Sequence, residues 1–469
     1  MANLSEPARA LADASHCALF DPSAGPVSTA RKRSERAKRS GTLGRVLENA
    51  GWLLAGKGFS AILGVAYTAI LARSLGRQDF GEFVLVVGTA ALVSSFVAFQ
   101  TWQAMVRFGM DHVRETISPG LSRLTAFCIA LDLGGAIVGC ILAGVAVLLL
   151  GPSFEWSPGF QLEVLLFCCV MLLSIRSAAS GLLRVHDQFA LGAAADSVQA
   201  AMRMVGAVVV LLVEPTVRHF LLAWAVAEVT MALVYWILAA RTEGWDLRSV
   251  SWRDVRSVPG EHPGLWQFVA ITNAGVTLRS ISRQLPVLLV GLVVGTAAAG
   301  AYRLAHQLGQ ALARIGDLLS RAIFAELARL HSGGGGDKLN TLFRSSTRLA
   351  LGGAVVIVAV LLLIGEPLLR LVAPAFVGAY PLLLILGIAA AVEMVGVSFE
   401  PALMATGRAG TAFRLRVMVT LFLLVMMAIL LPALGARGAA FANLSSACFA
   451  VLLFGWFTRR AMLQKDGVP

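Results

Sequence analysis

The chain alternates long apolar runs with short polar segments over most of its length. After a polar stretch at the N-terminus come twelve apolar runs, each long enough to cross a hydrocarbon core of about 30 Å as a helix of about 20 residues. We therefore expect an all-α, polytopic membrane protein with twelve transmembrane helices. The expected helices occupy residues 46–72, 83–107, 121–150, 160–184, 189–213, 219–240, 265–292, 298–328, 345–365, 380–405, 411–432 and 436–458.

The basic residues between these runs predict which side of the membrane each segment faces. With the N-terminus in the cytoplasm, the cytoplasmic segments hold 25 Lys and Arg residues and the external segments hold five. Cytoplasmic loops of membrane proteins are enriched in Lys and Arg. One helix more or fewer in mid-chain would exchange the sides of all later segments and destroy this asymmetry. The distribution of 25 and five basic residues therefore supports twelve helices with both termini in the cytoplasm.

The composition excludes several classes of protein. Hydrophobic residues make up 57% of the chain and charged residues 14%, whereas a soluble domain carries roughly 25% charged residues. The net charge of +12 lies in the N-terminal tail and the loops, which indicates membrane orientation rather than nucleic-acid binding. The sequence shows no nucleotide-binding glycine-rich loop, no catalytic constellation and no metal-ligand spacing. We expect a transporter that is not an enzyme, uses no cofactor and binds no nucleic acid.

The longest polar segment after the N-terminal tail divides the chain into two halves. Gly76 and Gly81 of the first half align with Gly295 and Gly300 of the second at an offset of 219 residues. Since each half has six helices, the halves would be parallel repeats related by a pseudo-two-fold axis along the membrane normal. The expected parts are a disordered basic cytoplasmic tail (1–45), an N-terminal six-helix bundle (46–240), a cytoplasmic interfacial linker (241–263), a C-terminal six-helix bundle (264–460) and a cytoplasmic tail (461–469).

Polar side chains follow one face of the eighth expected helix. One stripe of this helix follows from spacings of three and four residues, and it comprises Arg303, Gln307, Gln310, Arg314, Asp317 and Arg321. A polar stripe of this length cannot face lipid, so we expect it to line water or another polar surface. For Arg303, extension to the nearest membrane interface is an equally good explanation.

Basic side chains also gather near the middle of the membrane. At 1.5 Å per residue, Lys57, Arg279 and Arg314 all fall near mid-depth of their helices, and Arg283 shares the face of Arg279. An excess of guanidinium groups favours an anion, because arginine presents forked donors to phosphate oxygens and stays charged at any physiological pH. A cationic drug or metal ion would instead require carboxylates.

Carboxylates and amides complete the set of candidate site residues. Glu393 and Glu400 lie seven residues apart on one face of the tenth expected helix and could carry a coupling proton or cation. A structural ion pair with an arginine is the favoured alternative for each of them. Gln100, Gln103 and Asn273 are expected to line the same cavity as polar side chains.

Five stretches carry a family resemblance that extends over about residues 45–460. They are Leu71–Gly76 with Phe80–Phe83, Val106–Gly109, Gly300–Leu308, Ile323–Arg329 and Gly435–Ala440. Together they resemble the polysaccharide-biosynthesis flippases of the multidrug/oligosaccharidyl-lipid/polysaccharide exporter superfamily. The resemblance implies two bundles around a cationic cavity and transport of undecaprenyl-pyrophosphate-linked oligosaccharide to the outer leaflet, coupled to an ion gradient. Ala325 stands where the family commonly has proline.

This resemblance implies a flippase of the bacterial inner membrane that moves O-antigen or exopolysaccharide repeat units by alternating access. Lys57, Arg279, Arg283 and Arg314 would receive the pyrophosphate. The partners would be the lipid-linked glycan and membrane lipids, with a polysaccharide polymerase and export proteins as further candidates. Two alternatives stay open, namely a multidrug antiporter of the same fold, with carboxylates and aromatic residues in its cleft, and a lipid II flippase.

Overall fold

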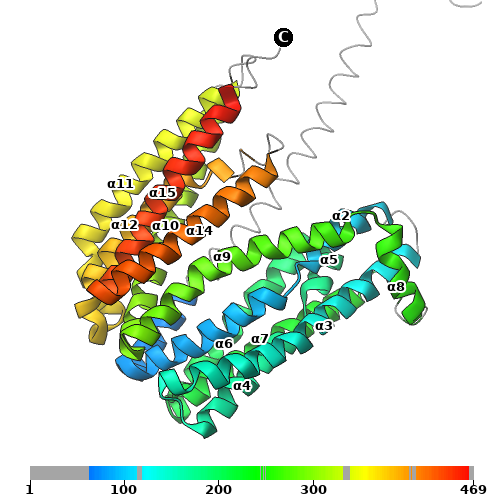
Figure 1. The fold of residues 1–469 in the computed structure, drawn as a ribbon, viewed down its shortest axis with the longest axis horizontal. Helices are drawn as coiled ribbons and strands as arrows, with labels where there is room; N and C mark the ends of the chain where they lie inside the picture. The colour runs from blue at the N-terminus through cyan, green and yellow to red at the C-terminus, as the bar shows by residue number, and fades with distance from the viewer. Residues whose placement is uncertain are drawn as a thin grey trace, which may run out of the picture. The chain divides into compact units, whose positions relative to one another are not determined.

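The computed structural model describes residues 63–112, 119–242, 245–246, 248, 250–330, 338–400, 403 and 408–463, and these are almost entirely helical (Figure 1). No β-strand occurs among them. The expected tail 1–45 and Lys57 lie outside the described residues, as does the end of the expected C-terminal tail.

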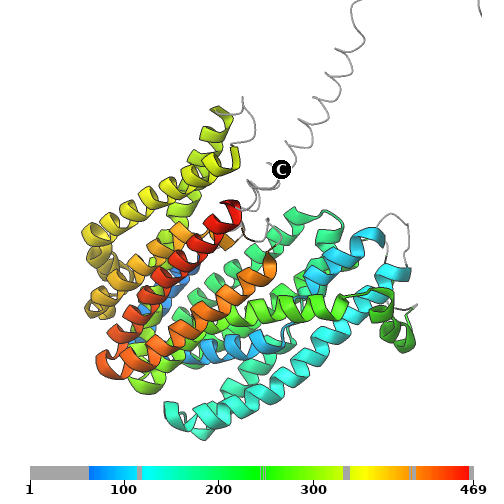
Figure 2. The ribbon, with the colours of Figure 1, turned by 45° about the horizontal axis from the view of Figure 1, so that its top comes forward.

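The helices follow one another through short connections. After the helical residues 63–97 come α2 (Thr101–Gly109), α3 (Pro119–Leu150), α4 (Pro158–Leu173), α5 (Ser177–Val185), α6 (Phe189–Val213), α7 (Val217–Ala240), α8 (Trp252–Glu261), α9 (Leu265–Val293), α10 (Thr296–Leu330), α11 (Lys338–Val372), α12 (Tyr380–Gly396), α14 (Ala409–Leu434) and α15 (Ala436–Leu463). Short 3₁₀ turns at Met110–His112, Pro152–Phe154 and Pro374–Ala379 join some of them. In both views α10, α11, α12, α14 and α15 lie together (Figure 1 and Figure 2).

Ten stretches of the described residues are long and apolar enough to cross a membrane. Leu63–Gly109 counts as one of these stretches, although it holds parts of two expected helices. The long helix α10 is not among the ten, since its stripe of arginine and glutamine lowers its hydropathy. The all-α, polytopic membrane class is therefore confirmed, while the count of twelve helices and the pseudo-two-fold axis stay predictions.

The chain reverses direction within residues 63–97, at Gly76. The rings of Tyr67 and Phe83 both contact the ring of Trp224, with centroid distances of 5.8 and 5.7 Å. A straight helix would separate residues 67 and 83 by about 24 Å. Gly76 has a φ of 74°, which glycine adopts without steric cost and which permits the reversal.

The glycines that align between the halves have matching roles in the backbone. Gly295 has a φ of 114°, so it resembles Gly76 in lying in the region that other residues avoid. A Cβ on Gly81 would lie 2.0 Å from the carbonyl oxygen of Thr296, and a Cβ on Gly300 would lie 3.0 Å from the Cα of Gly81. Gly81 and Gly300 thus bring the helical residues 63–97 and α10 into backbone contact.

Two of the expected helices are interrupted, which the apolar runs do not indicate. The run 83–107 breaks at residues 98–100 and the run 160–184 breaks at residues 174–176, although neither break contains proline or glycine. At the second break, the indole Nε1 of Trp236 donates a hydrogen bond of 2.8 Å to the carbonyl oxygen of Ile175. A neighbouring helix thereby satisfies a carbonyl group that a broken helix would leave unpaired in lipid.

Helix α9 packs against helices of both halves. Its side chains stabilise the break at 98–100, where Thr277 donates 2.6 Å to the carbonyl oxygen of Ser95 and Asn273 donates 3.2 Å to that of Phe96. The start of α9 is buried in the same apolar cluster as α3 and α5, through residues such as Leu265. The first helix expected in the C-terminal bundle is therefore anchored on N-terminal helices along its first three turns.

The expected linker 241–263 contains the short helix α8. Ser251 and Asp254 form a capping box at its start, which satisfies two free backbone N–H groups. Val258 is buried against the N-terminal helices, and Arg123 of α3 forms an ion pair of 3.0 Å with Glu261.

We predict that Gly81→Ala destabilises the protein, because the new methyl group meets the backbone of Thr296. Neither backbone segment can move away without disturbing its own helix. The expected cost is about 1–3 kcal/mol, as for overpacking of a tight contact. The measurement is the thermal unfolding midpoint of the purified protein in detergent. Gly134→Ala on α3 is the matched control, because outside the local helix backbone no heavy atom lies within 4 Å of its Cβ position, and it should leave the midpoint unchanged or raise it. A Gly81→Ala midpoint equal to that of the control would contradict the close crossing.

Candidate functional site

Four arginines from three helices line one cavity among α9, α10, α12, α14 and α15. Arg279 and Arg283 come from α9, Arg314 from α10 and Arg416 from α14, and the cavity has a volume of about 370 Å³. Arg279 and Arg283 share a face of α9 because they are four residues apart. We call this space the arginine cavity.

Glu400 is already partnered within the arginine cavity. One of its carboxylate oxygens accepts a hydrogen bond from Arg416, and the other lies 3.9 Å from Nη1 of Arg279. Glu400 therefore neutralises one guanidinium group directly and a second one weakly.

Glu393 has a neutral partner instead. Its Oε2 accepts a hydrogen bond of 3.0 Å from Nε2 of Gln310 on α10. Arg283 and Arg314 form no ion pair with any residue that the structure describes. With four guanidinium groups and two carboxylates, the described lining of the arginine cavity has an excess of positive charge.

A second space, which we call the aromatic cavity, lies among the helical residues 63–97, α6, α7 and α10. Its volume is about 340 Å³, and its aromatic lining includes Tyr67 and Trp224. The guanidinium carbon of Arg203 lies 3.6 Å from the centroid of the Trp224 ring, an arrangement that stabilises a cation in an apolar setting. Gln307 of α10 donates a hydrogen bond of 2.6 Å to Oγ1 of Thr68, which joins the two halves across this cavity.

A third space, the broken-helix cavity, is lined by both helix interruptions. Residues 97–100 and 174–177 contribute to its wall, and its volume is about 490 Å³. Two short helices, α2 and α5, begin at these interruptions. Since a half-helix inside the membrane presents backbone dipoles at its ends, the wall is polar even where its side chains are not.

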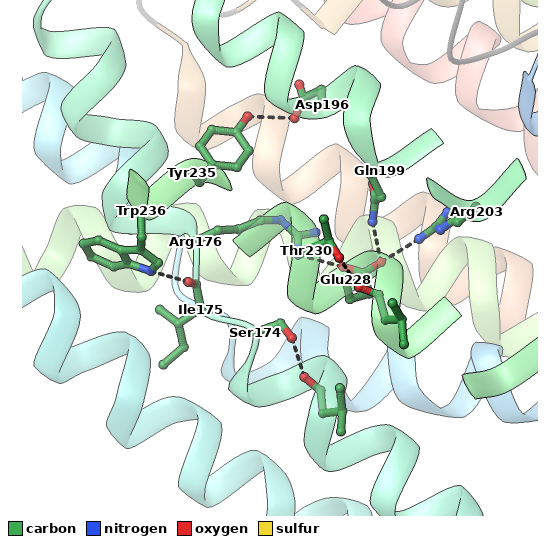
Figure 3. A network of polar contacts seen from close by, with 12 residues as sticks. Ser174, Ile175, Arg176, Asp196, Gln199, Arg203, Glu228, Thr230, Tyr235 and Trp236 are labelled. Atoms are coloured by element: carbon green, nitrogen blue, oxygen red, sulfur yellow. Dashed lines mark hydrogen bonds and ion pairs between the residues drawn. The ribbon is translucent and has the colours of Figure 1, made fainter. Parts of the chain in front are cut away.

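Glu228 holds two arginines together between the aromatic and broken-helix cavities. Only 2% of its side chain is exposed, and it accepts hydrogen bonds of 2.7 Å from Arg176 and 2.6 Å from Arg203, as Figure 3 shows. Gln199 donates a further hydrogen bond to the same carboxylate. Three donors on one carboxylate satisfy its lone pairs and leave the cluster with a net positive charge.

The three cavities are adjacent along a polar path. Arg314 lines both the arginine cavity and the aromatic cavity. Asp196 and Gln199 line both the aromatic cavity and the broken-helix cavity. The described walls of the path carry eight arginines, Arg176, Arg184, Arg203, Arg279, Arg283, Arg303, Arg314 and Arg416, and five carboxylates, Asp132, Asp196, Glu228, Glu393 and Glu400. The path therefore favours an anion over a cation.

The structure brings most of the candidate residues to this path but divides them among cavities. Those in the arginine cavity are Arg279, Arg283, Gln310, Arg314, Glu393 and Glu400. Arg303 and Gln307 line the aromatic cavity, and Gln100 lines the broken-helix cavity. Gln103 and Asn273 line none of these three cavities. Lys57 and the side chains of Asp317 and Arg321 lie outside the described residues.

Sequence reasoning missed four arginines of the path, namely Arg176, Arg184, Arg203 and Arg416. Arg176, Arg203 and Arg416 each interrupt an apolar run, as Arg279 does, so the rule that a charge inside the membrane has a function or a partner applies to them equally. Tyr67 and Trp224 gave no such signal, because aromatic residues are ordinary members of transmembrane helices.

The amino-acid sequence is similar to a known protein family and to a bacterial membrane protein. A family model described as polysaccharide biosynthesis protein matches residues 46–331. The inner membrane protein YghQ of Escherichia coli (strain K12) is 27% identical over 341 residues, which cover 71% of this chain and 93% of that protein.

Two solved structures show the same fold. An inward-facing multidrug resistance MATE family transporter of the MOP superfamily gives a TM-score of 0.65 at 14% identity and covers 87% of this chain and 96% of its own. The lipid II flippase MurJ in an inward closed conformation gives a TM-score of 0.63 at 12% identity and covers 87% of each chain. At these identities the likeness concerns the fold alone, and the two proteins are described as a transporter and a flippase.

We predict that Glu228→Gln strongly destabilises the protein, because Arg176 and Arg203 lose their shared counter-charge. The expected cost is roughly 3 kcal/mol, as for the breaking of a buried ion pair. Thermal unfolding of the purified variant in detergent measures it.

The matched control is Glu163→Gln, whose ion pair of 3.0 Å with Arg218 has side chains 37% and 63% exposed. An exposed pair stabilises a protein by about 1 kcal/mol at most, so the control should stay close to the parent protein. Equal effects of the two substitutions would show that Glu228 does not act as a buried counter-charge.

Proposed function

Because the chain belongs to the polysaccharide biosynthesis protein family and has the fold of MOP-superfamily transporters, we propose that it is a flippase for lipid-linked oligosaccharides. Its substrate is an undecaprenyl-pyrophosphate-linked repeat unit of an O-antigen or exopolysaccharide. It moves this unit across the bacterial inner membrane by ion-coupled alternating access, without covalent chemistry. The observation that carries the proposal is the arginine cavity, where Arg279, Arg283, Arg314 and Arg416 face two carboxylates.

The charge of the arginine cavity fits a pyrophosphate. Moving such a group from water into a membrane without partners is prohibitive, so its charge has to be met by the protein. Arg283 and Arg314 have no ion pair among the described residues and are free to donate to phosphate oxygens. Guanidinium donors suit this role because they bind phosphate with two parallel hydrogen bonds and keep their charge.

The charge of the path argues against a cationic drug as the substrate. A cation would meet more guanidinium groups than carboxylates along the described walls, and Glu400 and Glu228 are already bound to arginines. Lipid II carries a pyrophosphate as well, so the arginine cavity suits both lipids. The family description favours the unit of a polysaccharide.

Contacts between the halves support one closed state of an alternating-access cycle. Nε of Arg73 donates a hydrogen bond of 3.1 Å to the carbonyl oxygen of Val372, and Gly81 approaches the backbone of Thr296. The distribution of basic residues predicts that these segments lie at the external side. We infer that the external side is closed and that the lipid enters from the cytoplasmic leaflet, with both termini in the cytoplasm.

Glu393 is the better of the two candidates for ion coupling. Glu400 is held by Arg416, so its protonation would first have to break that ion pair. Among the described residues, Glu393 has the amide of Gln310 as its one direct hydrogen-bond partner, and it lines the arginine cavity. A proton or cation at Glu393 would therefore change the charge of the cavity that binds the pyrophosphate.

The proposal also predicts the location of the protein and its partners. The relative from Escherichia coli is an inner membrane protein, which supports the same location here. The basic tail 1–45 would lie at the cytoplasmic surface, where anionic headgroups attract it. A polysaccharide polymerase and export proteins are the proposed downstream partners.

We predict that Arg279→Ala and Arg314→Ala each weaken the binding of farnesyl pyrophosphate, a sugar-free headgroup probe, by at least about tenfold. A hydrogen bond to a charged group contributes about 1.5–3 kcal/mol, which sets this magnitude. Titration calorimetry of the purified proteins measures the affinity, and lysine at either position should restore it in part.

Arg370→Ala on α11 is the matched control, because Arg370 pairs with Glu366 on the exposed surface and lines none of the three cavities. In the native host the two cavity variants should lose surface polysaccharide at normal expression. Normal polysaccharide with well-expressed Arg279→Ala and Arg314→Ala proteins would exclude the proposed role of the cavity.

We predict that Glu393→Gln loses the part of transport that depends on an ion gradient, because the neutral amide takes up no proton at physiological pH and has no negative charge to hold a cation. The measurement is flipping of a fluorescent farnesyl-pyrophosphoryl N-acetylglucosamine in proteoliposomes, with and without an imposed proton or sodium gradient. Glu366→Gln at the exposed surface is the control. If the gradient stimulates flipping by Glu393→Gln as much as flipping by the parent protein, Glu393 has no part in the coupling step.

A further inference from the structure

Three buried polar atoms without a partner belong to the lining of the aromatic cavity. They are Oη of Tyr67, Nε of Arg203 and Nε1 of Trp224, and none of them has a hydrogen-bond partner in the described part of the chain. Tyr67 is only 6% exposed. Buried polar groups in proteins are almost always hydrogen-bonded, so three unpartnered donors gathered in the wall of one cavity point to a ligand as their partner.

The three residues converge from separate elements. Tyr67 lies in the first described helix, Arg203 on α6 and Trp224 on α7. Their mutual contacts hold them in place, since the Tyr67 and Trp224 rings meet edge to face at 5.8 Å and Arg203 covers the Trp224 ring. A group of polar atoms that is both preorganised and unsatisfied is typical of a binding site rather than of a packed core.

The chemistry of the lining identifies the class of ligand. Neutral hydrogen-bonding side chains, Thr68, Gln199 and Gln307, face aromatic walls that include Phe83 and Trp224. A pyranose ring has apolar C–H faces, which pack on aromatic surfaces, and hydroxyl groups at its edge, which both donate and accept hydrogen bonds. Amphipathic aromatic side chains with polar tips suit such a ligand.

The position of the cavity identifies which sugar it would hold. In a lipid-linked oligosaccharide the first sugar is bonded directly to the pyrophosphate, so the two groups need adjacent sites. Arg314 lines both the arginine cavity and the aromatic cavity, and Arg303 and Gln307 continue along α10 into the latter. The covalent order of lipid, pyrophosphate and sugar therefore matches the order of the two cavities along α10.

We propose, on the basis of the flippase function above, that the aromatic cavity binds the sugar ring attached to the pyrophosphate. Tyr67, Trp224 and Arg203 donate hydrogen bonds to its oxygens, and Gln199 and Gln307 complete the polar contacts. The glycan is then recognised by helices of the N-terminal half and α10, whereas the pyrophosphate is recognised by helices of the C-terminal half. Gln103 and Asn273, which the sequence predicted to line the cavity, take no part in this assignment.

The test compares a headgroup with and without sugar. The probes are farnesyl pyrophosphate and farnesyl-pyrophosphoryl N-acetylglucosamine, titrated against the purified full chain in detergent. The parent protein should bind the sugar-bearing probe more tightly. Tyr67→Phe and Trp224→Phe should each weaken binding of that probe by about fivefold, the loss of one hydrogen bond, and leave the sugar-free probe unchanged.

Two matched variants control for the loss of a buried aromatic polar group elsewhere. Tyr302→Phe changes a tyrosine that is 1% exposed, and Trp156→Phe removes another unpartnered indole N–H, and neither residue lines any of the three cavities. Both should retain the parent affinities for both probes. A second measurement needs no substitution, because a diazirine on the acetamido group of the sugar-bearing probe should label the peptides that contain Tyr67 or Trp224.

The outcomes separate this inference from the flippase proposal. Three outcomes would overturn the sugar site and leave the pyrophosphate site intact. They are equal binding of both probes by the parent protein, photolabelling of other peptides, and a sugar preference that persists in both Tyr67→Phe and Trp224→Phe. Binding of neither probe would overturn both. Equal affinity for the water-soluble UDP-N-acetylglucosamine would assign the cavity to a nucleotide sugar and overturn the proposal for a lipid-linked one.

Discussion

A guanidinium group inside a membrane has to be solvated by the protein, and this requirement organises the interior of the chain. Arg203 is held by Glu228 and by the face of Trp224, and Arg416 is held by Glu400. Burial of an ion is tolerated only where such partners compensate the lost hydration. Where the partners are fewer than the arginines, as around Arg314, the remaining positive charge is available to an anionic ligand.

A second constraint is that every backbone group in the membrane needs a hydrogen bond. The breaks at residues 98–100 and 174–176 are possible because Thr277, Asn273 and Trp236 supply donors to carbonyl groups beside them. These donors come from α7 and α9, so the broken-helix cavity exists only when those helices are in place. The polar path is thus a property of the packed protein and of no single helix.

Part of the site could be predicted because charge inside an apolar run is rare and has a restricted set of explanations. The spacing of Arg279 and Arg283 and the stripe on α10 predict polar helix faces, and the structure places residues of both faces in cavity walls. Which cavity each residue lines was not predictable, because that depends on how the helices are rotated and crossed. Asn273 shows the limit, since its amide satisfies the carbonyl group of Phe96 instead of lining one of the three cavities.

The sequence by itself determined the membrane class, the positions of the apolar helices and the excess of basic groups among them. Hydrophobicity and charge are local properties, and they decide for each segment separately whether it is stable in lipid. It also indicated that Gly76 and Gly81 correspond to Gly295 and Gly300, whereas their roles in turning the chain and joining the halves came from the structure. Only the tertiary structure decided where two helices break, which carboxylate holds which arginine, and that Tyr67 and Trp224 share a cavity with Arg203. These features depend on contacts between residues far apart in the chain, and no local pattern specifies them.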